Sequence, residues 1–244
     1  MAFPRPNLSV RALALLGMFS LGALSSAAAD RVFTVLAAGP GDWTDFGVVD
    51  GVKFIPVEPG RRARSAEQRL VSGSAEVVFA RRVANPETGL IENQVVSRVA
   101  WPAGAERALF VLAPRTTPEG QGIVEALACD DGLEKFPPQS LRVVNATRAV
   151  FQGLVGRGQM QIGTGVTAPV KTDDFIPAHE EAPDPGMPLR LALATDKGVK
   201  TLYAVNLSVS PNDRVLLVVA PPAKAGSMRL KVSVVHDVVA PVEK

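Results

Sequence analysis

The feature that most constrains the fold of this chain is a succession of short apolar or alternating runs, each bounded by proline, glycine or acidic residues. Residues 229–234 alternate basic or hydroxyl side chains with leucine and valine, which is the pattern of a strand with one buried face. Residues 215–219 are continuously apolar, as is typical of a central strand covered on both faces. Because no stretch of about 12 residues carries a helical stripe of apolar side chains, the sequence predicts an all-β protein.

Strands are predicted wherever such a run lies between two turn signals. In the first half of the chain the runs are residues 31–36, 52–57, 76–81, 94–100, 108–113 and 123–129. In the second half they are residues 141–145, 149–155, 159–162, 166–171, 189–194, 201–207, 215–220 and 228–236. Residues 67–70 are expected to form at most one helical turn, because Gly73 follows soon after.

An internal repeat indicates two related halves. Arg107 to Pro114 reads RALFVLAP and Arg214 to Pro221 reads RVLLVVAP, with identical residues at five of the eight positions. Residues 55–65 align with 160–170 at a similar offset, so that Gly60 matches Gly165. The ordered matches predict two tandem sandwich-like (Ig-like) domains with similar strand order, residues 30–134 and 135–244.

The first 29 residues have the three parts of a cleavable secretory signal. Arg5 and Arg11 make a positive start, residues 12–24 are mostly apolar, and small residues at 25–29 suit a signal peptidase. The alternative is a retained membrane anchor, but a spanning helix needs about 20 apolar residues and this run is shorter. We therefore expect cleavage before Asp30, no membrane span in the mature protein, and a periplasmic or secreted location.

The charge balance changes once this signal is removed. The chain has 26 basic and 24 acidic residues, and loss of Arg5 and Arg11 leaves 24 of each sign. A neutral chain offers no overall attraction to nucleic acid or to an anionic membrane surface. Cys129 is the only cysteine in the sequence, so we expect it to be a small buried side chain, with a reactive thiol as the alternative.

One series of motifs supports the same picture. An apolar strand at 105–114 is followed by Pro-Pro-Gln-Ser at 137–140, by Leu-Arg-Val-Val-Asn-Ala-Thr at 141–147, and by glycine-containing turns. This order resembles that of uncharacterised secreted bacterial proteins with tandem β-sandwich-like segments. They carry Gly in place of Gln139, and Leu-Ser in place of the Ala-Thr at 146–147. The resemblance covers most of residues 50–235 and implies export and fold, with no activity, cofactor or site attached.

The densest polar cluster lies between residues 173 and 184. Its acidic and imidazole side chains are candidate ligands for a cation such as Ca²⁺: Asp173, Asp174, His179, Glu180, Glu181 and Asp184. The regular ligand spacing of a calcium loop is missing, and prolines at 177, 183 and 185 favour an extended, solvated loop. Asp130-Asp131-Gly132 has the composition of a turn.

Three aromatic residues with polar groups are candidates for ligand binding: Trp43, Trp101 and Tyr203. Exposed aromatic rings stack on sugars in carbohydrate-binding sandwiches. Packing in a core or at a domain interface is the expectation we favour for all three. The glycosylation-type triplets at 145–147 and 206–208 lie on predicted strands and are treated as incidental.

The sequence contains few groups suited to catalysis. Its two histidines, His179 and His236, lie far along the chain from Cys129, and nucleophile-elbow, phosphate-loop and zinc-helix motifs are absent. We therefore expect a non-enzymatic binding or assembly module of the cell envelope, without a cofactor, whose partner is a protein or a glycan. The alternatives are a carbohydrate-binding protein, a periplasmic chaperone with two Ig-like domains, and a metal-dependent hydrolase around 173–184.

Overall fold

The computed structural model describes residues 31–117, 119–172, 186–210, 212–221 and 230–239, and every regular element in these ranges is a β-strand. Inner sheet 1 has the order β4 (Gln68–Leu70), β1 (Arg31–Ala37), β7 (Arg107–Thr116), β8 (Gly122–Asp130). Outer sheet 1 has the order β3 (Lys53–Pro56), β2 (Phe46–Asp50), β5 (Glu76–Ala84), β6 (Ile91–Ala100).

The second half of the chain repeats this plan. Inner sheet 2 has the order β12 (Gly165–Val166), β9 (Ser140–Asn145), β16 (Asp213–Ala220), β17 (Lys231–Val238), and β13 (Val170–Lys171) also pairs with β9. Outer sheet 2 has the order β11 (Gly158–Ile162), β10 (Phe151–Val155), β14 (Met187–Thr195), β15 (Gly198–Leu207). The all-β fold of two tandem, sandwich-like halves with the same strand order is therefore confirmed.

The correspondence between the halves extends to irregular features. Each inner sheet contains one parallel pair, β1 with β7 and β9 with β16, among antiparallel neighbours. Each outer sheet has a register shift at the same place, after Phe79 where β5 pairs with β6 and after Leu191 where β14 pairs with β15. Bulges bend and twist a strand. Their recurrence at matching positions shows that the two halves share their backbone geometry.

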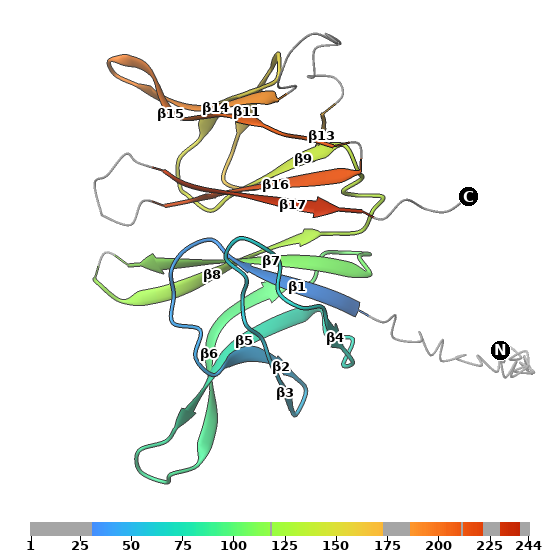
Figure 1. The fold of residues 1–244 in the computed structure, drawn as a ribbon. Coiled ribbons are helices and arrows are strands. Elements are labelled where there is room, and N and C mark those ends of the chain that lie inside the picture. The colour runs from blue at the N-terminus through green and yellow to red at the C-terminus, as the bar shows by residue number, and fades with distance from the viewer. Residues whose placement is uncertain (1–30, 118, 173–185, 211, 222–229, 240–244) are drawn as a thin grey trace, which may run out of the picture.

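The four sheets stack as layers, with the two inner sheets face to face in the middle (Figure 1). The repeated segment therefore has both faces buried, and successive side chains point to opposite faces. In β7, Leu109, Val111 and Ala113 face inner sheet 2, whereas Phe110 and Leu112 join the core shared with outer sheet 1. The matching positions of β16 divide in the same way between two cores.

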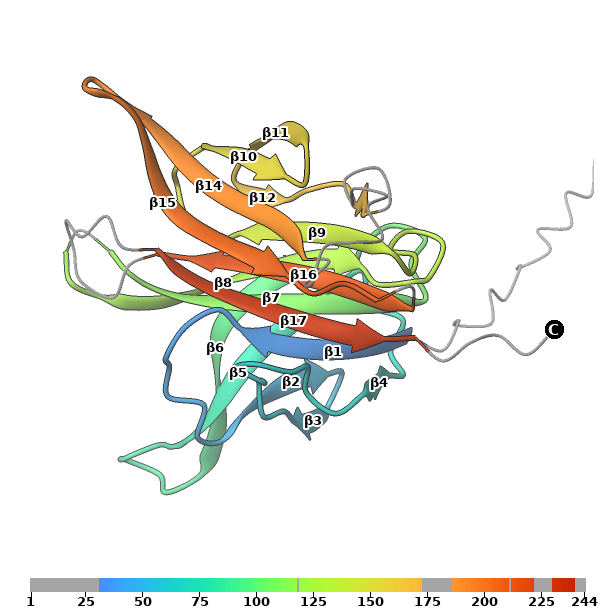
Figure 2. The ribbon, with the colours of Figure 1, turned by 45° about the horizontal axis from the view of Figure 1, so that its top comes forward.

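Inner sheet 1 and inner sheet 2 meet through equivalent positions. Leu109 of β7 and its counterpart Leu216 of β16 both lie in this central core, as do Cys129 of β8 and its counterpart Val235 of β17. Such self-complementary contact is what a twofold axis produces in a symmetric dimer. The hairpins β5–β6 and β14–β15 extend beyond the layers (Figure 2).

The structure corrects several details of the expected strands. Residues 68–70 form the edge strand β4 and pair with β1, so the helical turn expected there is wrong. Strand β2 was missed, and residues 166–171 divide into β12 and β13. The immunoglobulin constant fold places its first, second, fifth and fourth strands in one sheet. Here the first strand of each half pairs with the last but one, β1 with β7 and β9 with β16. The likeness to the immunoglobulin fold therefore lies in two packed sheets and not in the strand order.

Candidate functional site

A cleft of about 1070 Å³ opens at one end of the two inner sheets. It lies across the carboxyl ends of β1, β7 and β16, where the chain leaves the layers. The repeated segment contributes matching residues to it, because both Ala113-Pro114 and Ala220-Pro221 line the wall. Both halves of the protein therefore build this cleft. Gly122 also lines the cleft, as do the side chains of Trp43, Arg81, Arg115, Arg148 and Lys231.

The loop that joins β1 to β2 forms one wall of the cleft. It spans residues 38–45, whereas the matching β9–β10 connection spans only 146–150. Asp42 holds the loop in a tight turn by accepting a hydrogen bond from the Thr44 N–H at 3.0 Å. The hydrogen bonds from Thr44, with the charge of Arg81, lower the pKa of Asp42 below its usual value. Asp42 thus shapes a turn in this loop, which is longer than its counterpart in the second half.

Trp43 lies at the end of this loop and is partly buried. Its ring contacts Phe46 edge-on at 5.0 Å between centroids, which joins it to the core of the first half. The loop packs tightly against the indole, since a Cβ atom added at Gly41 would lie 2.7 Å from Trp43 Cζ2. Gly41 is therefore required by the close approach of the backbone to the ring.

Basic side chains surround the cleft, and they differ in how they are paired. Arg115 bonds to Glu125 at 2.5 Å and donates to the carbonyl of Ala146 at 2.6 Å, which links the two halves at this end. Arg81 pairs with Asp42 at 3.5 Å. Arg148 and Lys231 are exposed, and neither has a hydrogen-bond or ion-pair partner among the described residues. The cleft therefore carries two positive charges that have no acidic partner among the described residues.

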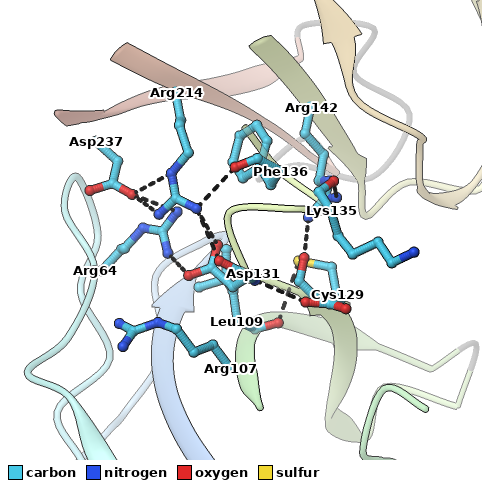
Figure 3. A network of polar contacts seen from close by, with 12 residues as sticks. Arg64, Arg107, Leu109, Cys129, Asp131, Lys135, Phe136, Arg142, Arg214 and Asp237 are labelled. Carbon is cyan, nitrogen blue, oxygen red and sulfur yellow. Dashed lines mark hydrogen bonds and ion pairs between the residues drawn. The ribbon is translucent and has the colours of Figure 1, made fainter. Parts of the chain in front are cut away.

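A ring of four charged side chains joins the two halves at the opposite end of the inner sheets (Figure 3). Arg64 and Arg214 both bind Asp131 and Asp237, so each carboxylate contacts two guanidinium groups. Arg214 also donates to the main-chain carbonyl of Asp131 at 3.0 Å. Asp131 and Arg214 are buried, and such a pair contributes geometric specificity because a buried charge needs its partners in place.

The same region holds the connection between β8 and β9. Phe136 is completely buried between Arg142 and Arg214, whose guanidinium carbons lie 4.5 and 5.0 Å from its ring centroid (Figure 3). Arg142 donates to the main-chain carbonyls of Asp130 and Lys135, and Arg214 donates to that of Phe136 at 3.2 Å. The connection is therefore fixed against the sheets by side chains from the second half.

Two of the residues in this ring of charges, Arg214 and Asp237, have counterparts at matching positions of the first half, Arg107 and Asp131. Arg107 opposes Asp131 in inner sheet 1 as Arg214 opposes Asp237 in inner sheet 2. In the second half Arg214 forms an ion pair with the aspartate opposite it, Asp237. In the first half Arg107 forms its ion pair with Glu67 instead of Asp131. The turn interpretation of 130–132 applies to Asp130, which accepts from the Gly132 N–H at 2.9 Å. The turn interpretation did not identify Asp131 as an ion-pair residue. The sequence signal for that role is that the repeat places an arginine, Arg107 or Arg214, opposite an aspartate in each half.

The three aromatic candidates do not form one surface. Trp101 is buried in the first core, where its indole N–H donates to the Ala105 carbonyl at 2.8 Å. Tyr203 packs against the second core from β15, and burial raises the pKa of its hydroxyl. Trp43 alone lines the cleft. The packing role favoured from the sequence therefore holds for Trp101 and Tyr203.

The proposed metal ligands cannot be placed, because Asp173, Asp174, His179, Glu180, Glu181 and Asp184 all lie outside the described residues. Within the described ranges, no three His, Cys, Asp or Glu side chains are grouped closely enough to hold a metal ion. His236 contacts buried Asp213 at 2.6 Å across β17 and β16. Neither residue of this pair lines the cleft.

Cys129 is the small buried side chain that the sequence favoured. Burial raises the pKa of its thiol to about 11, and its Sγ–H donates weakly to the Leu109 carbonyl at 3.6 Å. Asn145 is also buried, and its amide donates to the carbonyls of Ala149 and Gly163 at 2.8 and 2.9 Å. The polar residues of the Arg-Val-Val-Asn strand thus serve the fold.

Neither a family model nor a curated protein matches this chain. Among the described residues, none belongs to a helix with the length and apolar character needed to cross a bilayer.

Proposed function

We propose that this protein is an exported, non-enzymatic binding module of the cell envelope and that the cleft at the end of the inner sheets is its binding site. The observation that carries the proposal is that equivalent strand ends from both halves converge on this cleft, together with a connection that is longer in the first half than in the second.

The chemistry of the cleft favours binding over turnover. Its described walls contain guanidinium, ammonium, indole, amide and proline groups and the hydroxyl of Thr116, and no described histidine, cysteine, serine or glutamate lines it. Asp42 is the one carboxylate there among the described residues, and Thr44 and Arg81 already occupy it. Nucleophilic and general-base catalysis need an activated group beside the reacting atom. The lining groups instead suit recognition of charge and of flat apolar faces.

The rigid joint between the halves supports the same function. The ring of Arg64, Asp131, Arg214 and Asp237 fixes one end of the interface, and Arg115 fixes the other by its bond to Ala146. Between them lies a continuous apolar core. A site built from two halves binds best when its walls need no rearrangement, because ordering them on binding costs free energy. The joint therefore preorganises the cleft.

A matched pair of glycine substitutions tests the proposal. A Cβ atom at Gly122 or at Gly163 meets nothing within 4 Å, neither residue has a positive φ, and both are exposed, so a side chain can be attached at either without a clash at its Cβ. Gly122 lines the cleft and Gly163 does not. Gly122→Trp should abolish retention of envelope components on the immobilised protein, whereas Gly163→Trp should leave it intact.

Equal retention by both variants would refute the cleft as the binding site. Multiple turnover of any envelope substrate by the purified protein, lost in Gly122→Trp, would refute the non-enzymatic assignment.

A further inference from the structure

We infer that the cleft takes an acidic oligosaccharide, a chain of sugars that bears carboxylate or sulfate groups. This inference rests on the proposed binding function and names its ligand class. It depends on three properties of the cleft, which are its uncompensated charge, its flat apolar faces and its size.

The first property is positive charge that the protein does not use. Arg115 and Arg81 have acidic partners, but Arg148 and Lys231 have none among the residues the structure describes. Arg148 lies in the connection between β9 and β10, and Lys231 is the first residue of β17. The two cations therefore come from separate elements of the cleft wall. Charge-assisted bonds to an anion are stronger than neutral ones. Two separate cations suit a ligand with repeated negative groups.

The second property is a set of flat, rigid apolar faces beside these cations. Trp43 and the prolines Pro40, Pro114 and Pro221 line the same cleft. An indole ring combines a broad apolar surface with low conformational entropy, and the C–H faces of a pyranose stack on it. The amides of Gln94 and Gln121 supply groups that both donate and accept, as sugar hydroxyls require.

The third property is the size of the cleft, and the strands that line it bear on the alternative of an acidic peptide. Extended peptides commonly add to a free sheet edge, where a row of unpaired N–H and C=O groups binds the main chain. This cleft crosses the ends of β1, β7 and β16, which have neighbours on both sides in their sheets, but residues 94–96 of β6 and 122–124 of β8 also line it, and both of these are edge strands. The strand arrangement therefore does not choose between the two ligands, and the choice of a glycan depends on the indole and proline faces and on the two glutamine amides. The cleft volume of about 1070 Å³ is at the upper end for small-molecule pockets, which suits several linked sugars.

The experiment measures binding of defined oligosaccharides by calorimetry and by tryptophan fluorescence. The probes are a carboxylated oligogalacturonate, a sulfated heparin oligosaccharide, a neutral galactan oligosaccharide of similar length, and poly-glutamate. Because Trp43 and Trp101 are the two tryptophans, a Trp101→Phe background makes Trp43 the only reporter. We expect at least one acidic oligosaccharide to bind, to change Trp43 fluorescence, and to bind more weakly as salt rises.

Charge variants then test the named residues. The double variant Arg148→Ala, Lys231→Ala should weaken binding of the acidic oligosaccharide by about tenfold or more, the loss expected for charged hydrogen bonds. Arg157→Ala is the matched control, since Arg157 is an exposed arginine on the β10–β11 turn and is absent from the cleft. It should bind as the parent protein does.

The outcomes separate this inference from the proposed function. Binding of the neutral glycan with equal affinity, or an unchanged affinity in the double variant, overturns the inference and leaves the cleft as a binding site. Binding of poly-glutamate in preference to every sugar overturns the glycan class. Failure of all four probes to bind overturns the inference, and the Gly122→Trp comparison with envelope components still decides the proposed function.

Discussion

The substitution Asp131→Asn tests whether the charged ring holds the two halves together. The asparagine keeps the shape of the side chain and removes its charge. In the native protein Asp131 is 3% exposed and contacts both Arg64 and Arg214. After substitution the two guanidinium groups face Asp237 alone, so the ring changes from two charges of each sign to two positive charges and one negative.

The expected cost follows from the burial of the ring. Removal of one partner from a fully buried ion pair costs about 3–5 kcal/mol, because a buried charge loses its compensation. The side chains of Arg64 and Asp237 are 13% and 28% exposed, so water screens part of the imbalance. We therefore expect the free energy of unfolding to fall by about 2–3 kcal/mol, below the fully buried value.

Urea unfolding, followed by circular dichroism and by tryptophan fluorescence, measures this change. Asp130→Asn is the control, because Asp130 is the neighbouring acid, and an asparagine there keeps an oxygen that accepts from the Gly132 N–H. The control should lose less than about 1 kcal/mol, as surface charges do. If Asp131→Asn is no more destabilising than Asp130→Asn, the ring does not stabilise the joint and the reasoning is wrong.

Three further predictions concern single residues. Burial raises the pKa of Asp50, but hydrogen bonds from residues 71 and 72 lower it by more, so the net pKa is lowered. The stability that Asp50 contributes is then complete above its unfolded pKa of about 3.9 and is lost as the pH falls through the lower folded value; Asp50→Asn should flatten acid unfolding in this range, and an unaltered acid limb would contradict it. Cys129→Val should change stability by less than about 1.5 kcal/mol, because the matching position in the second half is already valine, and a thiol reagent should label native Cys129 only after unfolding; rapid labelling of the folded protein would count against its burial. Gly41→Ala should displace Trp43 and weaken ligand binding while far-ultraviolet dichroism stays unchanged, since the added Cβ would lie 2.7 Å from the ring; wild-type affinity in this variant would show that Trp43 makes no contact with the ligand.

Most of the strands could be predicted because strand formation is encoded locally. The alternation in β17 and the continuous apolar run in β16 follow from one or two buried faces, and both are visible within a few residues. The short edge strand β4 was missed because it has only three residues, and its pairing with β1 comes from a partner about 35 residues away. The site was found only in part, since Trp43 was a candidate among three and nothing nearby distinguished it from Trp101.

The sequence by itself determined the strand pattern, the duplicated plan and the local turns, since each depends on neighbouring residues or on a repeat at a nearly constant offset. Only the tertiary structure decided which faces meet. It joined Arg64, Asp131 and Asp237 into one ring, and it brought Trp43, Arg148 and Lys231 to one cleft. These groups are separated by tens to more than a hundred residues. Their contact arises from the packing of inner sheet 1 on inner sheet 2, a long-range arrangement that no local pattern of hydrophobic and polar residues specifies.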